Sequence, residues 1–192
     1  MSELLLDMPL DQEARDCAEN IQRSANGLLT VINDILDLSK VESGRLDVEE
    51  VQFSLSVVIR DVNKMMSFAA ERKGLTYESF IQPEIERDIK VMGDPGRVRQ
   101  ILTNLLTNSI KFTSEGSVKL SVSIIGVTTD TVKVNFEVED TGIGIEEDVR
   151  KRLFKPFSQA DSSTARRFGG TGLGLTISKN VSAVPCYCIG TG

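Results

Sequence analysis

The sequence contains no histidine among its 192 residues. A reaction step that needs an imidazole therefore cannot use a side chain of this chain. Cysteine is scarce: the three residues Cys17, Cys186 and Cys188 form no paired framework, which favours a reducing compartment. Only one residue separates Cys186 from Cys188, which is too few for the usual zinc spacing.

Long hydrophobic runs and positive charge are also lacking. No apolar stretch approaches the length needed to cross a membrane, and no signal-peptide pattern opens the chain. The net charge of −6 argues against a general binder of nucleic acids or membrane surfaces. We therefore expect no nucleic-acid partner and no membrane segment in this chain. Its length suffices for one full domain and an additional piece.

Glycine and other small residues gather in two boxes, of which the first spans Asp140–Ile145. It follows an alternating run in which Val134, Phe136 and Val138 point to one side, the period-2 pattern of a half-buried strand. A carboxylate at the end of such a strand can accept a hydrogen bond from an exocyclic amine such as that of adenine. A simple turn at the end of a strand is the alternative interpretation.

The second box spans Gly169–Leu175, after a polar, basic loop and before an apolar helical stretch. A glycine-rich turn that leads into a helix N-terminus favours anions, because unpaired N–H groups and the helix dipole both attract negative charge. Neither box has the Gly-Lys-Ser/Thr of a P-loop, and neither fits the glycine fingerprint of a dinucleotide-binding βαβ unit.

The first part of the chain is predicted to be helical. Residues 1–8 resemble the end of one helix, and residues 11–42 form a long one that stops before Gly44. A heptad seam runs along this long helix. Its members are Cys17, Ile21, Ser24, Leu28, Val31, Ile35 and Leu38. The seam favours an antiparallel helical hairpin that dimerises, although a single amphipathic helix on a core would show a similar pattern.

The remainder mixes strands and helices. We expect strands over 48–53, 75–81, 89–92, 116–125 and 131–140, and helices over 54–73, 94–112, 146–153 and from about 173. Ser54 and Asp94 are the predicted N-caps, and Pro95 takes the first helical position after Asp94. The predicted buried face is Val58, Val62, Met65 and Ala69 on the 54–73 helix, and Val98, Ile101, Leu102 and Leu105 on the 94–112 helix.

A polar stripe lies opposite the apolar face of the 94–112 helix. It consists of Arg97, Gln100, Asn104, Asn108 and Lys111. Asparagine is a poor residue for a helix interior, so two of them at i, i+4 are unusual choices for solubility alone. An amide oxygen of Asn108 suits Mg²⁺, and Lys111 provides a charge for phosphate. A solvated helix face is the alternative.

Four motifs occur together and in order: Asn104–Thr113, Asp140–Ile145, Phe154–Phe157 and Gly169–Leu175. In this order they resemble the N box, the first glycine box, the F box and the second glycine box of the ATP-binding catalytic domain of sensor histidine kinases. The style of the boxes is that of hybrid kinases. The resemblance implies an α+β fold: a Bergerat-type two-layer α/β sandwich with a mixed sheet, preceded by the remnant of a helical hairpin. It divides the chain into a partial dimerisation and phosphotransfer hairpin at 1–46 and a C-terminally truncated ATP-binding domain at 47–192.

The resemblance also implies roles for individual residues. Asp140 would bind the adenine amine and Asn108 would hold Mg²⁺. Asn104 and Lys111 would lie near the metal and the phosphates, with Arg166 as a further catalytic residue on a lid from 157 to 167. The remaining expected contacts to the nucleotide are Gly142, Gly144, Ile145, Phe157, Arg167, Gly170, Thr171, Gly172, Leu173 and Gly174.

The expected function is transfer of the γ-phosphoryl group of ATP to a histidine outside this chain, with no self-phosphorylation. The expected partners are ATP, a second hairpin in a homodimer or heterodimer, and a receiver domain, in the cytoplasm. Two departures from the family accompany this reading: the missing histidine, and a tail in which Pro185 breaks the last helix. A non-catalytic nucleotide-binding regulator and a hydrolytic ATPase of the same fold are the alternatives.

Overall fold

The computed structural model describes residues 2–43, 49–87, 89–128, 131–150, 152–154, 172–181 and 187–188. The chain divides into two compact units, Met1–Leu46 and Asp47–Gly192. Within the described residues, no helix combines the length and the apolar character needed to span a membrane.

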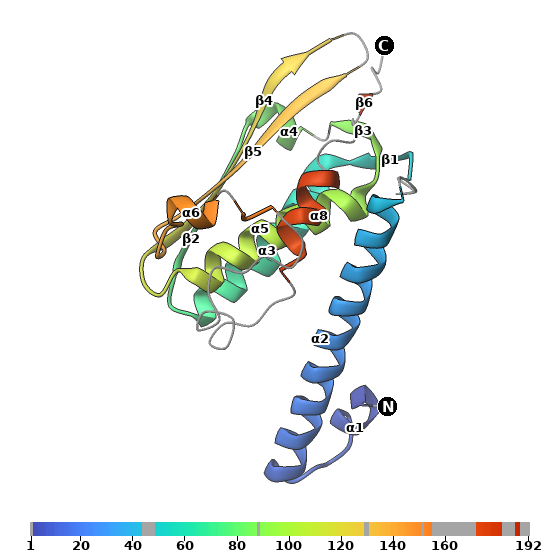
Figure 1. Ribbon diagram of the computed structural model, residues 1–192, viewed down its shortest axis with the longest axis vertical. Helices are drawn as coiled ribbons and strands as arrows, with labels where there is room; N and C mark the ends of the chain where they lie inside the picture. The colour runs from blue at the N-terminus through green and yellow to red at the C-terminus, as the bar shows by residue number, and fades with distance from the viewer. Residues whose placement is uncertain are drawn as a thin grey trace. The chain divides into compact units, whose positions relative to one another are not determined.

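The first unit contains helix α1 (Ser2–Leu6) and the long helix α2 (Gln12–Glu42) (Figure 1). The side chain of Asp11 begins α2 by accepting a hydrogen bond from the amide of Ala14 at 2.8 Å. Much of the predicted seam is exposed, with 58% of Ile21 and 61% of Leu28 accessible to solvent. The long helix is confirmed, and much of its apolar seam is exposed in the described structure.

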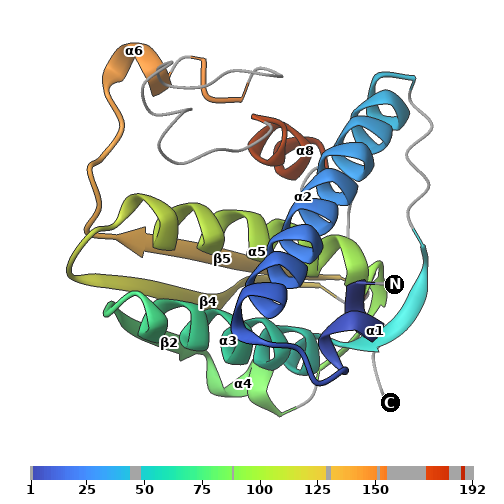
Figure 2. The same ribbon diagram turned by 90° about the horizontal axis from the view of Figure 1, so that it is seen from below.

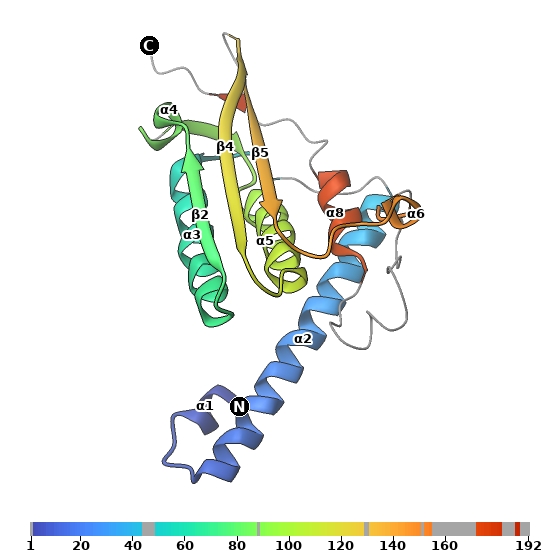
Figure 3. The same ribbon diagram turned by 90° about the vertical axis from the view of Figure 1, so that its left-hand side faces the viewer.

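The second unit is a two-layer sandwich in which α3 (Leu55–Arg72) and α5 (Pro95–Phe112) pack side by side against one face of a mixed sheet (Figures 2 and 3). This sheet has the order β2 (Thr76–Ile81), β4 (Ser117–Val127) and β5 (Val132–Asp140). Strand β2 pairs with β4 in parallel, and β4 pairs with β5 in antiparallel. The expected α+β sandwich with a mixed sheet is therefore confirmed.

A second small sheet has the order β1 (Val51–Ser54), β3 (Lys90–Gly93) and β6 (Tyr187–Cys188), all antiparallel. Short helices α4 (Pro83–Glu86) and α6 (Glu147–Arg150) and the longer α8 (Gly174–Val181) complete the elements. Neither α4 nor β6 was predicted. Both are too short to show a period, and β6 depends on a partner strand almost a hundred positions earlier in the chain.

The core between the helices and the sheet confirms the strand alternation and corrects the helix faces. Val118, Leu120 and Val122 of β4 are fully buried, in agreement with the strand predicted over 116–125. On α3, however, Met65 is 47% exposed and Met66 is buried instead. On α5, Leu106 is fully buried, whereas Leu105 is only partly buried. The predictions failed at adjacent apolar pairs, where the sequence pattern cannot decide which member faces the core.

Candidate functional site

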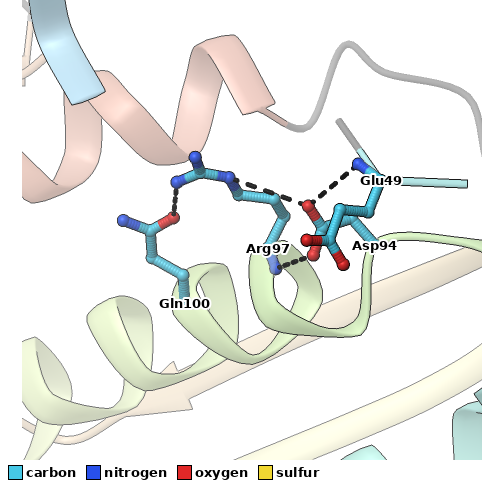
Figure 4. A network of polar contacts seen from close by, with 4 residues as sticks. All are labelled: Glu49, Asp94, Arg97 and Gln100. Atoms are coloured by element: carbon cyan, nitrogen blue, oxygen red, sulfur yellow. Dashed lines mark hydrogen bonds and ion pairs between the residues drawn. The ribbon is translucent and has the colours of Figure 1, made fainter. Parts of the chain in front are cut away.

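The start of α5 is fixed by a network around Asp94 (Figure 4). One carboxylate oxygen of Asp94 caps the helix by accepting from the amide of Arg97 at 3.0 Å. The other accepts from the amide of Glu49 at 3.3 Å and lies 4.0 Å from Nε of Arg97. The guanidinium of Arg97 also donates to Gln100 at 2.8 Å. The first two residues of the polar stripe therefore hold the N-terminal turn of the helix.

The first glycine box lies on the last turn of the same helix. Strand β5 ends at Asp140, whose Oδ1 accepts from the amide of Gly142 at 3.0 Å. The amide of Ile143 donates to the carbonyl of Phe112 at 3.3 Å. A Cβ at Gly142 would lie 2.7 Å from that carbonyl oxygen and 2.8 Å from Oδ1 of Asp140, so only glycine permits this approach. Gly144 then turns the chain with φ of +70°.

A second anchor holds the box on its other side. The amide of Thr141 donates to the carbonyl of Ser117 at 3.1 Å, and its hydroxyl accepts from the amide of Ser117 at 3.0 Å. Gly116 makes room for this hydroxyl at φ of +109°, since a Cβ there would overlap it. The box is thus fixed between α5 and the start of β4, which places the carboxylate of Asp140 at the rim of the sheet.

The second glycine box also reaches α5, through its last residues. Gly172 adopts φ of +70°, Leu173 is fully buried and Gly174 begins α8. The side-chain amide of Asn104 donates to the carbonyl of Gly174 at 3.3 Å and to the hydroxyl of Ser178 at 3.4 Å. A Cβ at Gly174 would lie 3.3 Å from Cγ of Asn104. Asn104 therefore joins α8 to α5.

Two further residues of the stripe occupy the C-terminal half of α5. Asn108 is half-buried, and its amide makes no hydrogen bond to any described residue. Lys111 follows it by almost one turn, and burial lowers the pKa of its ammonium below the usual value. Its Nζ lies 4.9 Å from the centre of the Phe112 ring. The end of α5 thus combines a partly desolvated cation with an amide that has no hydrogen-bond partner among the described residues.

This arrangement fits a ligand with an amine at one end and a metal-bound anion at the other. Asp140 provides the acceptor for the amine, and Lys111 provides positive charge. In the described parts of the chain no three histidine, cysteine, aspartate or glutamate side chains form a metal cluster. The neutral amide oxygen of Asn108 fits Mg²⁺, which takes few protein ligands and keeps water and phosphate oxygens.

The structure brings Asn104, Asn108, Lys111, Asp140 and Gly142 together around α5, and Gly172, Leu173 and Gly174 precede or begin the helix that packs on it. Gly144 and Ile145 lie on the exposed part of the first box. Five predicted site residues lie outside the described residues: Phe157, Arg166, Arg167, Gly170 and Thr171. The sequence interpretation missed Ser178 and Thr141, because each acts through a partner that is distant along the chain.

Comparison with known proteins agrees with this geometry. Residues 93–184 match the family model described as "Histidine kinase-, DNA gyrase B-, and HSP90-like ATPase", and residues 1–44 match the His Kinase A (phospho-acceptor) domain. The chain is 40% identical over 181 residues to hybrid signal transduction histidine kinase L of Dictyostelium discoideum. It is also 40% identical over 182 residues to the sensory/regulatory protein RpfC of Xanthomonas campestris pv. campestris.

The chain belongs to the sensor histidine kinase family. Both alignments cover 94% of this histidine kinase chain, but it spans only 10% of the Dictyostelium protein and 25% of the Xanthomonas one. A crystal structure of full-length ShkA in complex with AMPPNP superposes with a TM-score of 0.71 and 31% identity, covering 95% of this chain and 36% of ShkA. The histidine kinase AdeS of Acinetobacter baumannii, 22% identical, shares the fold with a TM-score of 0.64 over 94% of this chain and 84% of AdeS.

Proposed function

We propose that this chain binds Mg·ATP in the unit 47–192 and transfers the γ-phosphoryl group to a histidine on another polypeptide. The unit 1–46 then acts as a partial dimerisation and phosphotransfer hairpin. The observation that carries this proposal is the convergence of three sequence motifs on one helix. The first glycine box contacts α5 at Phe112, the second contacts it at Asn104, and Asn108 lies between these contacts with its amide unpaired among the described residues.

Each residue has a definite task in this proposal. The carboxylate of Asp140 accepts a hydrogen bond from the adenine amine, and Gly142 and Gly144 allow the backbone to approach the base. The amide oxygen of Asn108 is the protein ligand for Mg²⁺, which when bound neutralises charge on the phosphates. Lys111 adds a cation beside the phosphates. Gly172, Leu173 and Gly174 shape the turn before α8, and Ile145 contributes to the exposed wall.

The sequence assigns further roles to residues outside the described part of the chain. Arg166 and Arg167 belong to the basic stretch expected to be the lid, and we propose that either can reach the phosphates, with Arg166 as the catalytic one. Phe157, Gly170 and Thr171 are further proposed contacts to the nucleotide. These assignments rest on the resemblance of the motifs alone.

The proposed reaction breaks the bond between the γ-phosphorus and the bridging oxygen and forms a bond between phosphorus and nitrogen. The imidazole nitrogen supplies the electron pair, ADP leaves with the pair of the broken bond, and the other ring nitrogen releases its proton to solvent water. Catalysis then consists mainly of positioning the reactants and neutralising charge. Hydrolysis would instead require a general base to activate water. Asn104 cannot serve as this base, because its amide cannot take a proton and donates hydrogen bonds to α8.

The exposed seam of α2 supports a second helical hairpin as a partner. Ile21, Leu28 and Ile35 are each at least 44% exposed, so a second helical hairpin would remove apolar surface from water. We propose a homodimer, or a heterodimer with a relative that carries the histidine. A receiver domain is the proposed acceptor downstream, and the cytoplasm is the proposed location.

The test is phosphoryl transfer between separate proteins. The purified 192-residue chain is incubated with Mg·ATP labelled at the γ-phosphate, first alone and then with a histidine-bearing hairpin from a relative. We expect no acid-labile label on the chain alone, because it contains no imidazole, and slow labelling of the added hairpin. The matched control is Asp140→Asn, which should reduce labelling.

Three outcomes separate the candidate functions. Acid-labile label on the chain alone would show that the chemistry is not transfer to histidine. ATP binding without labelling of the hairpin would favour the non-catalytic regulator. Release of inorganic phosphate at the same rate with and without the hairpin would favour the ATPase.

A further inference from the structure

A lysine on the neighbouring helix closes the C-terminal end of α5. Lys73 follows the last residue of α3, and its Nζ donates to the carbonyl of Ile110 at 2.6 Å and to the carbonyl of Lys111 at 2.8 Å. The last carbonyls of a helix have no partner within the helix and must be satisfied from outside. Lys73 thus satisfies two carbonyls of the turn that carries Lys111.

The direction of the two helices explains why a cation is needed there. Because β2 and β4 are parallel and each follows one of the helices, α3 and α5 also run parallel and end at the same end of the sandwich (Figure 3). The partial negative charges of two helix C-termini then lie side by side, and a cation near such ends is stabilising. The backbone amide of Lys73 caps α3 through Ala70 and Glu71, while its ammonium caps α5.

The same turn of α5 also contacts the first glycine box of the candidate nucleotide site. The next carbonyl, that of Phe112, receives the amide of Ile143 from the first glycine box. Asn108 and Lys111 lie on this turn or at its start. Fraying of the turn would therefore displace the metal ligand, the cation and the seat of the glycine box together.

We propose that Lys73 is a positioning residue for the Mg·ATP site: it touches no ligand and holds the last turn of α5 in the geometry that Asn108 and Lys111 require. This inference rests on the proposed function. It extends that function to a side chain on a different helix, outside the motifs, whose contribution is visible only in the folded structure.

The test compares three variants of the whole chain. Lys73→Met keeps much of the aliphatic stem and removes the ammonium, Lys73→Arg keeps the charge, and Lys64→Met is the matched control on the exposed face of α3. Amide hydrogen exchange is measured first, without nucleotide. Lys73→Met should accelerate exchange at residues 110–113 and leave the β4–β5 hairpin unchanged, whereas Lys73→Arg and Lys64→Met should match the parent.

Binding of a fluorescent ATP analogue is then measured with Mg²⁺ and with a chelator. A loss of fold stability alone would not change the ratio of the two dissociation constants for the folded fraction. The ratio compared is the dissociation constant with chelator divided by that with Mg²⁺. We expect a displaced Asn108 to lower this ratio about fivefold in Lys73→Met. Lys73→Arg should keep most of the parent's ratio. If Lys73→Met does not fold, Lys73→Gln takes its place in the same comparison.

The outcomes keep the two proposals apart. Unchanged exchange at residues 110–113 or an unchanged Mg²⁺ ratio in Lys73→Met would overturn the positioning role while leaving the proposed function intact. No nucleotide binding by the parent chain would overturn the proposed function, and the positioning role with it.

Discussion

The side-chain amide of Asn104 donates to the carbonyl of Gly174 across seventy positions of the chain, at 3.3 Å. This bond connects the helix of the candidate metal ligand to the second glycine box, at the first residue of α8. It also explains a residue type that helix propensity disfavours at this position. Asn104 is a linker between two motifs, and its chemical role in transfer remains a prediction.

Replacing Asn104 separates these possibilities. Asn104→Leu removes both hydrogen bonds to α8 and leaves the carbonyl of Gly174 and the hydroxyl of Ser178 without this partner. We expect the free energy of unfolding to fall by about 1–3 kcal/mol, measured by urea denaturation, together with weaker nucleotide binding. Asn104→Asp serves as the control, because a carboxylate can still accept from Ser178. Full stability of Asn104→Leu would contradict the linking role.

Nucleotide binding should depend on Asp140. Asp140→Asn keeps the shape but places an amide donor where an amine would donate. We expect at least a tenfold loss of ATP affinity, about 1.4 kcal/mol or more, measured with a fluorescent analogue. Glu139→Gln on the adjacent exposed position is the control. Equal affinity of the Asp140→Asn variant and the parent would remove Asp140 from the site.

Magnesium dependence should depend on Asn108. Its half-buried amide has no hydrogen-bond partner among the described residues, so Asn108→Ala should break no hydrogen bond to them. We expect the variant to lose affinity for Mg·ATP, about tenfold, and much less affinity for ATP in the presence of a chelator. Equal losses under both conditions would mean that Asn108 supports the fold.

The close approach of the first glycine box can be tested at Gly142. In Gly142→Ala the new methyl group would lie within 3 Å of the Phe112 carbonyl oxygen and of Asp140, both of which would have to shift. We expect a loss of ATP affinity, whereas the control Gly126→Ala, where a Cβ would make only an ordinary contact with Lys133, should keep the affinity of the parent. Equal affinity of Gly142→Ala and the parent would show that the box is seated differently.

The buried face of α5 provides a stability prediction independent of any ligand. Leu106 is fully buried between α3 and the sheet, so Leu106→Ala should reduce the free energy of unfolding by about 2–5 kcal/mol. Leu105→Ala, at the adjacent partly buried position, should cost less. Thermal unfolding of both variants measures the difference, and a larger cost at Leu105 would contradict the assigned face.

The sequence was sufficient for features that depend on near neighbours. Ser54 and Asp94 cap α3 and α5 as predicted, because a short polar side chain before an apolar run identifies a helix start by itself. The alternation from Val132 to Val138 predicted which side chains of β5 face the core. The family and its sandwich fold could also be predicted, from four motifs in order.

Features that depend on distant partners could not be predicted. The choice between Met65 and Met66 depends on where α5 lies against α3, and the sequence pattern around this pair does not contain that information. The attachment of Gly174 to Asn104, and of Lys73 to Ile110, joins segments that no spacing rule relates. The contacts that join the candidate site residues were therefore not predictable, and the membership of the site stays a prediction.

The parallel pairing of β2 with β4 has a consequence for the order of assembly. The β4–β5 hairpin needs only a short connection and can form as soon as both strands exist. Strand β2 must instead wait until β4 has been synthesised, because its partner for Thr76 is Ser117, about forty positions later. During synthesis the ribosome releases α3 and β2 first, with Val62 and Tyr77 facing a layer that is still incomplete. The early half of this unit thus spends a period with an open strand edge, and folding of the whole unit is governed by the arrival of β4.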